Sequence, residues 1–150
     1  MGFSPWGLVV SIAVLAPNLL LVVLPPRTPI AAASVPAVLV WLERAGQAAC
    51  LVVPAVTLPS ELSGGWSVPA GAALLLYWAL WVRYLATGRT ASALYRPAWR
   101  VPVPMAVLPV LVFLCAGLWL GNIVIVAAAL VLGAGHIPAS AIVAREVLGR

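Results

Sequence analysis

Long apolar blocks, each near the length of a membrane-spanning helix, occupy most of this chain. A helix needs about 20 mostly apolar residues to cross the hydrocarbon core of a bilayer. Three blocks of that kind cover residues 6–24, 37–58 and 68–86, and a fourth runs over residues 102–144. Only helices satisfy their own backbone hydrogen bonds within a single segment in lipid. The blocks therefore predict an all-α, polytopic integral membrane bundle.

The composition excludes an ordinary water-soluble domain. Of the 150 residues, 65% are hydrophobic and the mean hydropathy is +1.17, whereas soluble domains are about 45–50% apolar. A soluble globule of this size would lack the polar residues needed to cover its surface. The length is that of one domain, so we expect a single transmembrane helical domain over residues 1–150.

The fourth apolar block is too long for one crossing. It holds about 43 residues, roughly twice the length of a span. Gly121 and Asn122 lie near its middle and are residue types that favour a tight turn. Four helices remain the alternative if the chain does not turn there. The five predicted helices cover about residues 6–24, 37–58, 68–86, 102–120 and 122–144.

The arginines favour five crossings over four. The chain has eight arginines, three glutamates and a net charge of +5, and cytoplasmic loops are enriched in basic residues. Five crossings with the N-terminus outside and the C-terminus inside put every arginine on the cytoplasmic side and Glu61 outside. Four crossings would move Arg145 and Arg150 to the outside. The bias toward Ala, Val, Leu and Arg and the absence of Lys are typical of a bacterial genome rich in G and C. We therefore expect the protein in the cytoplasmic (inner) membrane of a bacterium.

Strongly polar side chains in the predicted helices lie at similar depths. Asn18, Glu43, Gln47, Tyr77 and His136 lie roughly 9–15 Å from the predicted cytoplasmic ends, at 1.5 Å per residue. Polar groups in hydrocarbon face the bundle interior or a wet cavity. We therefore expect one inward-facing polar pocket, open toward the cytoplasm.

Helical spacing selects the candidate residues of this pocket. Glu43 and Gln47 share one face of the second helix with Cys50, because they are one and two turns apart. Arg44 lies about 100° away around the same helix. The catalytic candidates are Glu43, His136 and Tyr77, and the substrate-binding candidates are Asn18, Arg44, Gln47, Trp78, Trp81, Arg83 and Tyr84.

A purely structural role is the alternative for the same residues. Glu43 can pair with Arg27, Arg44 or Arg83, and amides in membrane helices often bond only to carbonyls of neighbouring helices. His136 alone supplies too few ligands for a zinc site, so we expect no metal and no cofactor. The basic loop over residues 87–101 is interpreted as a topology signal, with an anionic lipid headgroup or a diphosphate as the alternative.

Four segments carry a resemblance to known proteins. LERAGQ (42–47), LYWALWVRYLATGR (76–89), PVPMAVLPVLVFL (102–114) and GHIPASAIVARE (135–146) together resemble an uncharacterised group of small bacterial polytopic membrane proteins. That group has no assigned activity, so the resemblance implies about five helices and no chemistry. LYRPAWRVPVP (94–104) is similar to a loop motif of the tryptophan-rich sensory/translocator family. It follows the third predicted helix here and the first helix there, so we interpret this second match as accidental.

The polar pocket predicts binding or transformation of a lipophilic substrate. A buried, protonated Glu43 could start the cyclisation of an isoprenoid or terpenoid, because the ring faces of Tyr77, Trp78 and Trp81 can stabilise carbocations. The small membrane-bound terpene cyclases follow this logic. The alternatives are a small proton-coupled transporter or exporter, and a non-catalytic accessory subunit of a membrane complex.

The expected partners follow from the same features. Membrane lipids surround the helices, and a lipophilic small molecule occupies the pocket. A homo-oligomer or a partner within the membrane is left open. Nucleic acid is not expected, because membrane topology already explains the excess of arginine.

Overall fold

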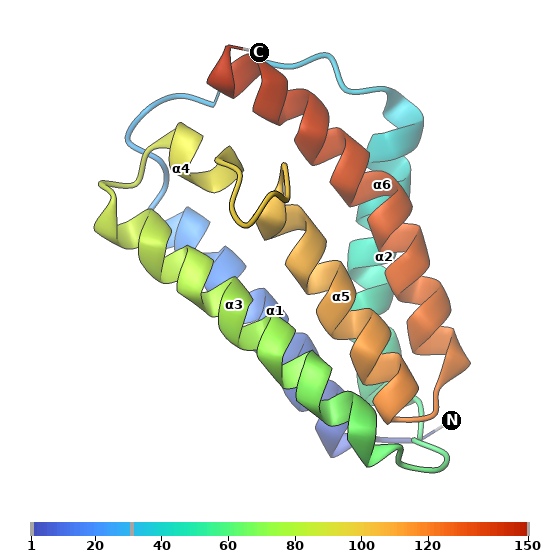
Figure 1. Ribbon diagram of the computed structural model, residues 1–150. Coiled ribbons are helices and arrows are strands. Elements are labelled where there is room, and N and C mark those ends of the chain that lie inside the picture. The colour runs from blue at the N-terminus through green and yellow to red at the C-terminus, as the bar shows by residue number, and fades with distance from the viewer. Residues whose placement is uncertain (1, 31, 150) are drawn as a thin grey trace.

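The all-helical class is confirmed. A computed structural model describes residues 2–30 and 32–149, and these form seven helical elements and no strand (Figure 1). In chain order the elements are α1 (Pro5–Val23), α2 (Ala37–Val56), the short 3-10 helix η1 (Gly64–Trp66), α3 (Ser67–Ala86), α4 (Ala91–Tyr95), α5 (Pro104–Trp119) and α6 (Ile123–Leu148).

The helix ends follow local capping rules. The Ser4 hydroxyl oxygen accepts a hydrogen bond from the first turn of α1, and Pro5 opens that helix. The Asn122 side chain accepts from two backbone N–H groups of the first turn of α6. Each of these side-chain caps satisfies N–H groups that have no partner within the helix. At the other end of α6, Gly149 adopts the left-handed conformation, with φ of 66°, that commonly ends helices.

The long apolar block turns where the sequence predicts. Gly121 has φ of 59°, which glycine adopts without steric cost, and α5 and α6 lie on either side of this turn. Helix α5 begins at Pro104, two residues later than predicted, because Val103 precedes a proline and stays outside the helical region, with φ of −133° and ψ of 68°. Helix α6 runs to Leu148, four residues beyond the predicted end.

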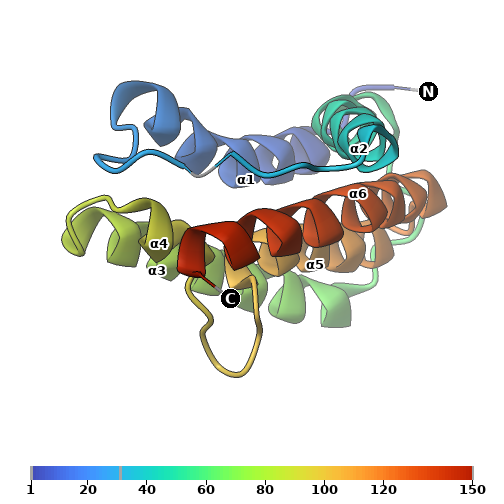
Figure 2. The same ribbon diagram turned by 90° about the horizontal axis from the view of Figure 1, so that it is seen from above.

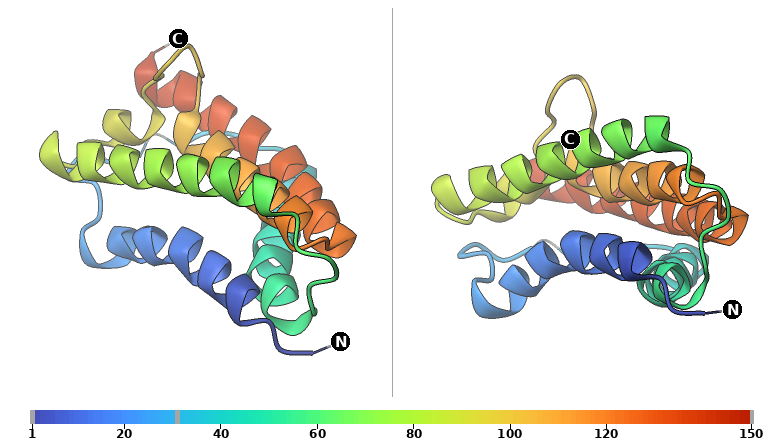
Figure 3. Two further views of the ribbon diagram at one scale, coloured as in Figure 1. Left: turned by 60° about the horizontal axis from the view of Figure 1, so that its bottom comes forward. Right: turned by 90° about the horizontal axis from the view of Figure 1, so that it is seen from below.

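The long helices form two layers. Helices α1 and α2 make one layer, and α3, α5 and α6 make the other, with α5 between its two neighbours (Figure 2). Helix α2 packs mainly on α6, and α1 packs on α2, α3 and α5. Neighbours around the bundle therefore follow the order α1, α2, α6, α5 and α3. Two further views show the same pair of layers (Figure 3).

The chain termini and loops lie at two opposite ends of the bundle. The N-terminal segment lies at one end, where the Ser4 N–H donates to the Ala55 carbonyl over 2.9 Å. At the same end, the Ser60 N–H donates to the Leu120 carbonyl over 3.1 Å, so the α2–α3 loop contacts the α5–α6 turn. The C-terminal end of α6 lies at the opposite end, with α4 (Figure 1).

The segments rich in arginine gather at that opposite end. The Arg27 N–H donates to the Arg89 carbonyl over 2.8 Å, and the Thr28 hydroxyl oxygen accepts from the Ala91 N–H over 2.8 Å. These bonds join the α1–α2 loop to the loop before α4. Residue 150 lies outside the described residues, so the position of Arg150 is not described.

Four helical segments are long and apolar enough to cross a membrane. They are Pro5–Val23, Ala37–Val56, Gly64–Ala86 and Ile123–Leu148. Helix α5 is equally apolar but has 16 residues, which is about 24 Å of helix against a hydrocarbon core of about 30 Å. These segments support the membrane location that the composition predicts.

Candidate binding site between the helices

The candidate site begins with a close crossing of α1 and α2. A Cβ atom at Gly7 would collide with the Pro54 carbonyl, so only glycine fits at this contact. One turn later, the Ser11 hydroxyl donates to the Cys50 carbonyl over 3.0 Å. Small residues allow helix backbones to approach in this way. From the crossing the two helices diverge, and they stand apart at their other ends (Figures 1 and 2).

A cavity of about 380 Å³ fills the space that opens between α1 and α2. Its floor comes from α3, α5 and α6, whose lining residues are buried or half-buried. The exposed lining residues, Asn18, Gln47 and Leu51, all belong to α1 and α2, so the mouth lies between these two helices. The cavity is lined by Val14, Leu15, Asn18, Leu21, Glu43, Gln47, Cys50, Leu51, Tyr77, Pro109, Phe113, Leu132 and His136.

Two glycines bring α2 and α6 close enough for Glu43 and His136 to meet. A Cβ atom at Gly135 would collide with the backbone of Glu43, and one at Gly46 would collide with the backbone of Leu132. The backbones of the two helices therefore touch at the level of the pair and again one turn away from it. The distance between Glu43 Oε1 and His136 Nδ1 is 2.7 Å.

The Glu43–His136 pair lies at the edge of the cavity rather than deep in the core. The side chains of His136 and Glu43 are 23% and 25% exposed. Gln47 Nε2 donates to the same Glu43 oxygen over 3.3 Å. His136 also lines a neighbouring cavity of about 110 Å³. An imidazole and a carboxylate at the edge of a cavity can both take part in hydrogen bonds to the polar group of a ligand.

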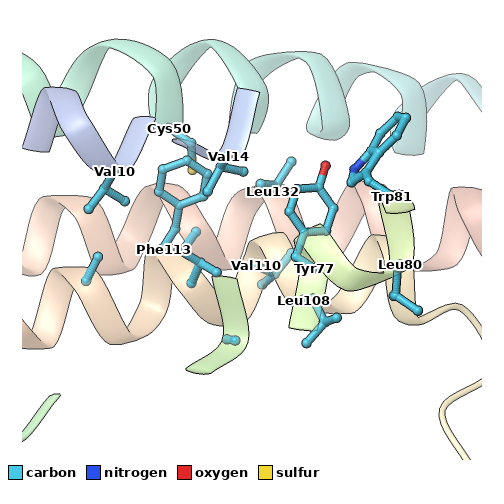
Figure 4. Close-up of a cluster of buried hydrophobic side chains, with 14 of the residues drawn as sticks. Val10, Val14, Cys50, Tyr77, Leu80, Trp81, Leu108, Val110, Phe113 and Leu132 are labelled. Carbon is cyan, nitrogen blue, oxygen red and sulfur yellow. The ribbon is translucent and has the colours of Figure 1, made fainter. Parts of the chain in front are cut away.

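A second polar group lies across the cavity, on α1 and α3. The Tyr77 hydroxyl donates to Asn18 Oδ1 over 3.1 Å, and Asn18 Nδ2 donates to the Val14 carbonyl over 3.3 Å. Tyr77 is almost fully buried. Figure 4 shows Tyr77 beside Leu132, with its hydroxyl oxygen pointing toward the layer of α1 and α2. The cavity is therefore apolar along its length, with polar groups on opposite walls.

Five of the predicted site residues line this one cavity. Glu43, His136, Tyr77, Asn18 and Gln47 come from four helices and from sequence positions far apart. Their shared depth along the helices predicted that they would lie at one level. The packing of α2 on α6 and of α1 on α3 brings them to the same space.

The other predicted residues lie elsewhere. Arg44 is exposed and lines none of the cavities described here, and Trp78 is 43% exposed, with its indole N–H donating to the Ala13 carbonyl of α1 over 2.9 Å. Trp81 is buried and lines only the smaller cavity. It stacks edge-on against Tyr77, with ring centroids 6.2 Å apart.

Arg83 and Tyr84 connect α3 to neighbouring segments. The guanidinium of Arg83 donates to the carbonyls of Ala93 and Arg96, over 3.4 Å and 3.3 Å. The fully buried Tyr84 donates from its hydroxyl to the Leu24 carbonyl over 3.0 Å. Neither side chain lines a described cavity, so both anchor loops at the arginine-rich end.

Tyr95 is a lining residue that sequence reasoning did not place in the site. This residue ends α4 and lines the smaller cavity with His136 and Ser140. Burial raises the pKa of the Tyr95 phenol, and the negative charge of Glu43 raises it further. The apolar side chains of Pro109 and Phe113 also line the main cavity, and apolar residues in an apolar helix carry no signal that would have identified them.

Among the described residues, no group of three or more His, Cys, Asp and Glu side chains could hold a metal ion. The expected absence of metal and cofactor stays a prediction. Comparison of the chain with protein-family models, with curated proteins and with solved structures finds no match. The resemblance to an uncharacterised group of small bacterial membrane proteins therefore also stays a prediction.

Proposed function

We propose that this protein binds a lipophilic small molecule within the membrane and holds the polar head of that molecule at the Glu43–His136 pair. The observation that carries the proposal is the 2.7 Å contact between these side chains at the edge of an apolar cavity. A few polar groups that converge in a mostly apolar pocket of 300–1,000 Å³ are typical of small-molecule sites. The volume of about 380 Å³ lies in that range.

The position of the mouth supports a ligand taken from the lipid phase. The mouth lies between α1 and α2, and both helices are apolar enough to cross a membrane. Leu51 and Leu15 line the cavity beside the mouth. An apolar ligand can enter sideways between the two helices without crossing water, whereas a strongly polar ligand would pay a desolvation cost at this edge.

We further propose five crossings, with the arginine-rich end in the cytoplasm of a bacterial cell. Helix α5 is short, but its last carbonyls and the turn after it accept hydrogen bonds from the α2–α3 loop, at the end opposite the arginines. Its neighbours α3 and α6 are both long enough to span. The excess of arginine at one end supports the orientation, because basic loops stay in the cytoplasm.

Proton-coupled transport is the second candidate function. The pair of titratable groups lies beside a mouth that opens between two helices, so a change of protonation could alter both ligand affinity and access. A flux of ligand into liposomes that depends on a proton gradient, and that Glu43→Gln abolishes, would favour transport over binding alone.

Cyclisation of an isoprenoid with Glu43 as the acid has weaker geometric support. A cyclase acid must deliver its proton to the substrate, whereas Glu43 already contacts His136 and Gln47. Trp78 points outside the main cavity and Trp81 lines only the smaller one. Tyr77 and Phe113 are the aromatic rings among the lining residues, so few ring faces are available to a carbocation.

Ligand retention in matched variants tests the proposal. Leu51 and Val52 are neighbours on α2 with similar exposure, 44% and 51%, but only Leu51 lines the cavity. We expect Leu51→Trp to lose the small molecules that co-purify with the wild-type protein in mass spectrometry of extracts, and Val52→Trp to retain them. Binding of added farnesol should follow the same order.

The polar part of the proposal has its own test. Glu43→Gln keeps the size of the side chain and removes its charge. It should weaken the binding of an isoprenoid alcohol such as farnesol about tenfold, which is the effect of losing one charged hydrogen bond. Equal retention of ligand in Leu51→Trp and wild type would refute a ligand in this cavity. Turnover of an isoprenoid diphosphate that disappears in Glu43→Gln would instead favour the cyclase.

A further inference from the structure

The loop between α4 and α5 holds two strained residues at its exposed tip. Ala98 and Val101 form an isolated antiparallel bridge, with N–H···O distances of 3.2 Å and 2.8 Å. Between them, Trp99 and Arg100 have φ of 48° and 70°. Two-residue turns of this kind favour Asn-Gly, because a Cβ atom makes the left-handed conformation sterically unfavourable.

Packing of these two side chains does not offset the strain. Trp99 is 60% exposed and Arg100 is exposed as well. The loop projects from the layer of α3, α5 and α6 beside the C-terminal end of α6 (Figure 2). Residues in sparsely populated backbone conformations cluster at functional sites, so the exposed Trp–Arg tip is a candidate for contact with a partner outside the chain.

A hollow of about 350 Å³ lies next to this tip. It is bounded by Pro102 and Val103, directly after the turn, and by the last turns of α6. It shares no lining residue with the cavity that holds Glu43. Its lining is apolar except for one arginine, and consists of Pro102, Val103, Ala141, Ala144, Arg145 and Leu148.

The charges around this hollow are mostly positive. Arg145 lines it, Arg100 lies two residues before Pro102, and both side chains are exposed. Within the described part of the chain, the one ion pair is Glu43 with His136, so neither arginine is paired there. Glu146, also exposed, is the one acidic residue in the last turn of α6.

We propose that this hollow, which we name the Arg145 groove, binds one anionic glycerophospholipid. The acyl chain lies along the apolar walls, the phosphate is held by Arg145 and Arg100, and Trp99 lies at the membrane interface. Tryptophan is enriched at that level of a bilayer, and basic side chains beside a membrane attract anionic headgroups. A free phosphate would leave the apolar walls without a partner. The proposal is independent of the ligand in the main cavity.

Lipid preference in vesicles tests the site. The 150-residue chain is reconstituted in phosphatidylcholine vesicles that contain a minor fraction of brominated phosphatidylglycerol. Quenching of Trp99 fluorescence is taken as the difference between wild type and Trp99→Phe. We expect brominated phosphatidylglycerol to quench Trp99 more strongly than brominated phosphatidylcholine at the same fraction. The double variant Arg100→Gln/Arg145→Gln should reduce this preference roughly thirtyfold, since each interfacial arginine contributes about fivefold.

A matched double variant separates a site from general attraction. Arg27→Gln/Arg44→Gln removes two exposed charges that do not line the groove and should keep the preference. Ala141→Phe fills the groove without changing charge and should reduce the preference. Equal quenching by the two lipids, an equal loss in the control, or displacement of the lipid by inorganic phosphate would overturn the proposal.

The strained turn supplies a further readout. Arg100→Gly removes both the charge and the strain, because glycine adopts positive φ freely. We expect its melting temperature in detergent to rise while its preference for phosphatidylglycerol falls. A variant with raised stability and an unchanged lipid preference would contradict a role for Arg100 in binding.

Discussion

A double-mutant cycle on Glu43 and His136 tests the geometry on which the proposed function rests. The variants are Glu43→Ala, His136→Ala and the double variant. Each single variant removes the 2.7 Å contact and also leaves a small space, and the double variant leaves both spaces. The coupling energy therefore isolates the contact from the loss of packing.

The structure sets the expected size of this coupling. A hydrogen bond to a charged group contributes about 1.5–3 kcal/mol in proteins. The two side chains are 23% and 25% exposed, and Gln47 also donates to Glu43, so Glu43 keeps a partner when His136 is removed. Both facts place the coupling at the lower end, about 1.5 kcal/mol, which is about a tenfold change in the unfolding equilibrium.

The free energies of unfolding are measured in mixed micelles. A denaturing detergent is titrated, and circular dichroism follows the loss of helix. A control cycle pairs Glu43→Ala with Glu61→Ala, because Glu61 is exposed in the loop at the other end of the bundle. The control should be additive within about 0.3–0.5 kcal/mol. A Glu43–His136 coupling that small would refute the contact and remove the anchor from the proposed binding site.

Three further predictions follow from other contacts. Burial and the charge of Glu43 raise the pKa of Tyr95 above its usual 10.0, so Glu43→Gln should lower that pKa and Glu61→Gln should leave it unchanged. Ultraviolet titration, with Tyr95→Phe as the reference, measures this pKa. The free energy of unfolding should fall as the pH rises above about 10, since the folded chain keeps a proton that the unfolded chain has released. Gly7→Ala should lower the free energy of unfolding by about 1–3 kcal/mol, because the new Cβ atom collides with the Pro54 carbonyl. Gly71 faces open space, so Gly71→Ala should instead raise the stability of its helix by up to about 1 kcal/mol. Equal melting temperatures of the two variants in detergent would contradict the close crossing. Asn122→Ala should lower the free energy of unfolding by about 1–2 kcal/mol, because Asn122 caps α6 and donates to the Thr57 hydroxyl over 2.7 Å. A decrease under about 0.5 kcal/mol in thermal unfolding would argue against the cap.

The helices could be predicted from the sequence because their signals are local. Hydropathy alone marks the long apolar segments, and Gly121 with Asn122 marks the turn between α5 and α6. Depth along a helix is also local, since each residue adds a fixed rise. That is why residues as distant as Asn18 and His136 could be expected at one level of the bundle.

The direction in which each side chain points could not be predicted in the same way. Tyr77 and Trp78 are neighbours in an apolar helix, yet Tyr77 faces the cavity and Trp78 contacts α1 from outside it. An apolar helix carries little amphipathic pattern to show which face packs inward. Arg83 bonds to carbonyls of α4 and of the loop after it, and Tyr84 bonds to a carbonyl at the end of α1. Those partners depend on the path of the chain rather than on residue type.

The glycines show why the site depends on packing that the sequence does not specify. Gly46 and Gly135 are visible as glycines in α2 and α6, but only the folded chain shows that they face each other's helices beside Glu43 and His136. These backbone contacts fix the distance between the two side chains, so the pair is held by rigid parts of the bundle. Helix α1 is different, because it crosses α2 closely at Gly7 and Ser11 and is joined to α3 by hydrogen bonds from the side chains of Tyr77 and Trp78. The wall that carries the polar anchor is therefore set by backbone contacts between α2 and α6, whereas side chains of α3 position the opposite wall formed by α1.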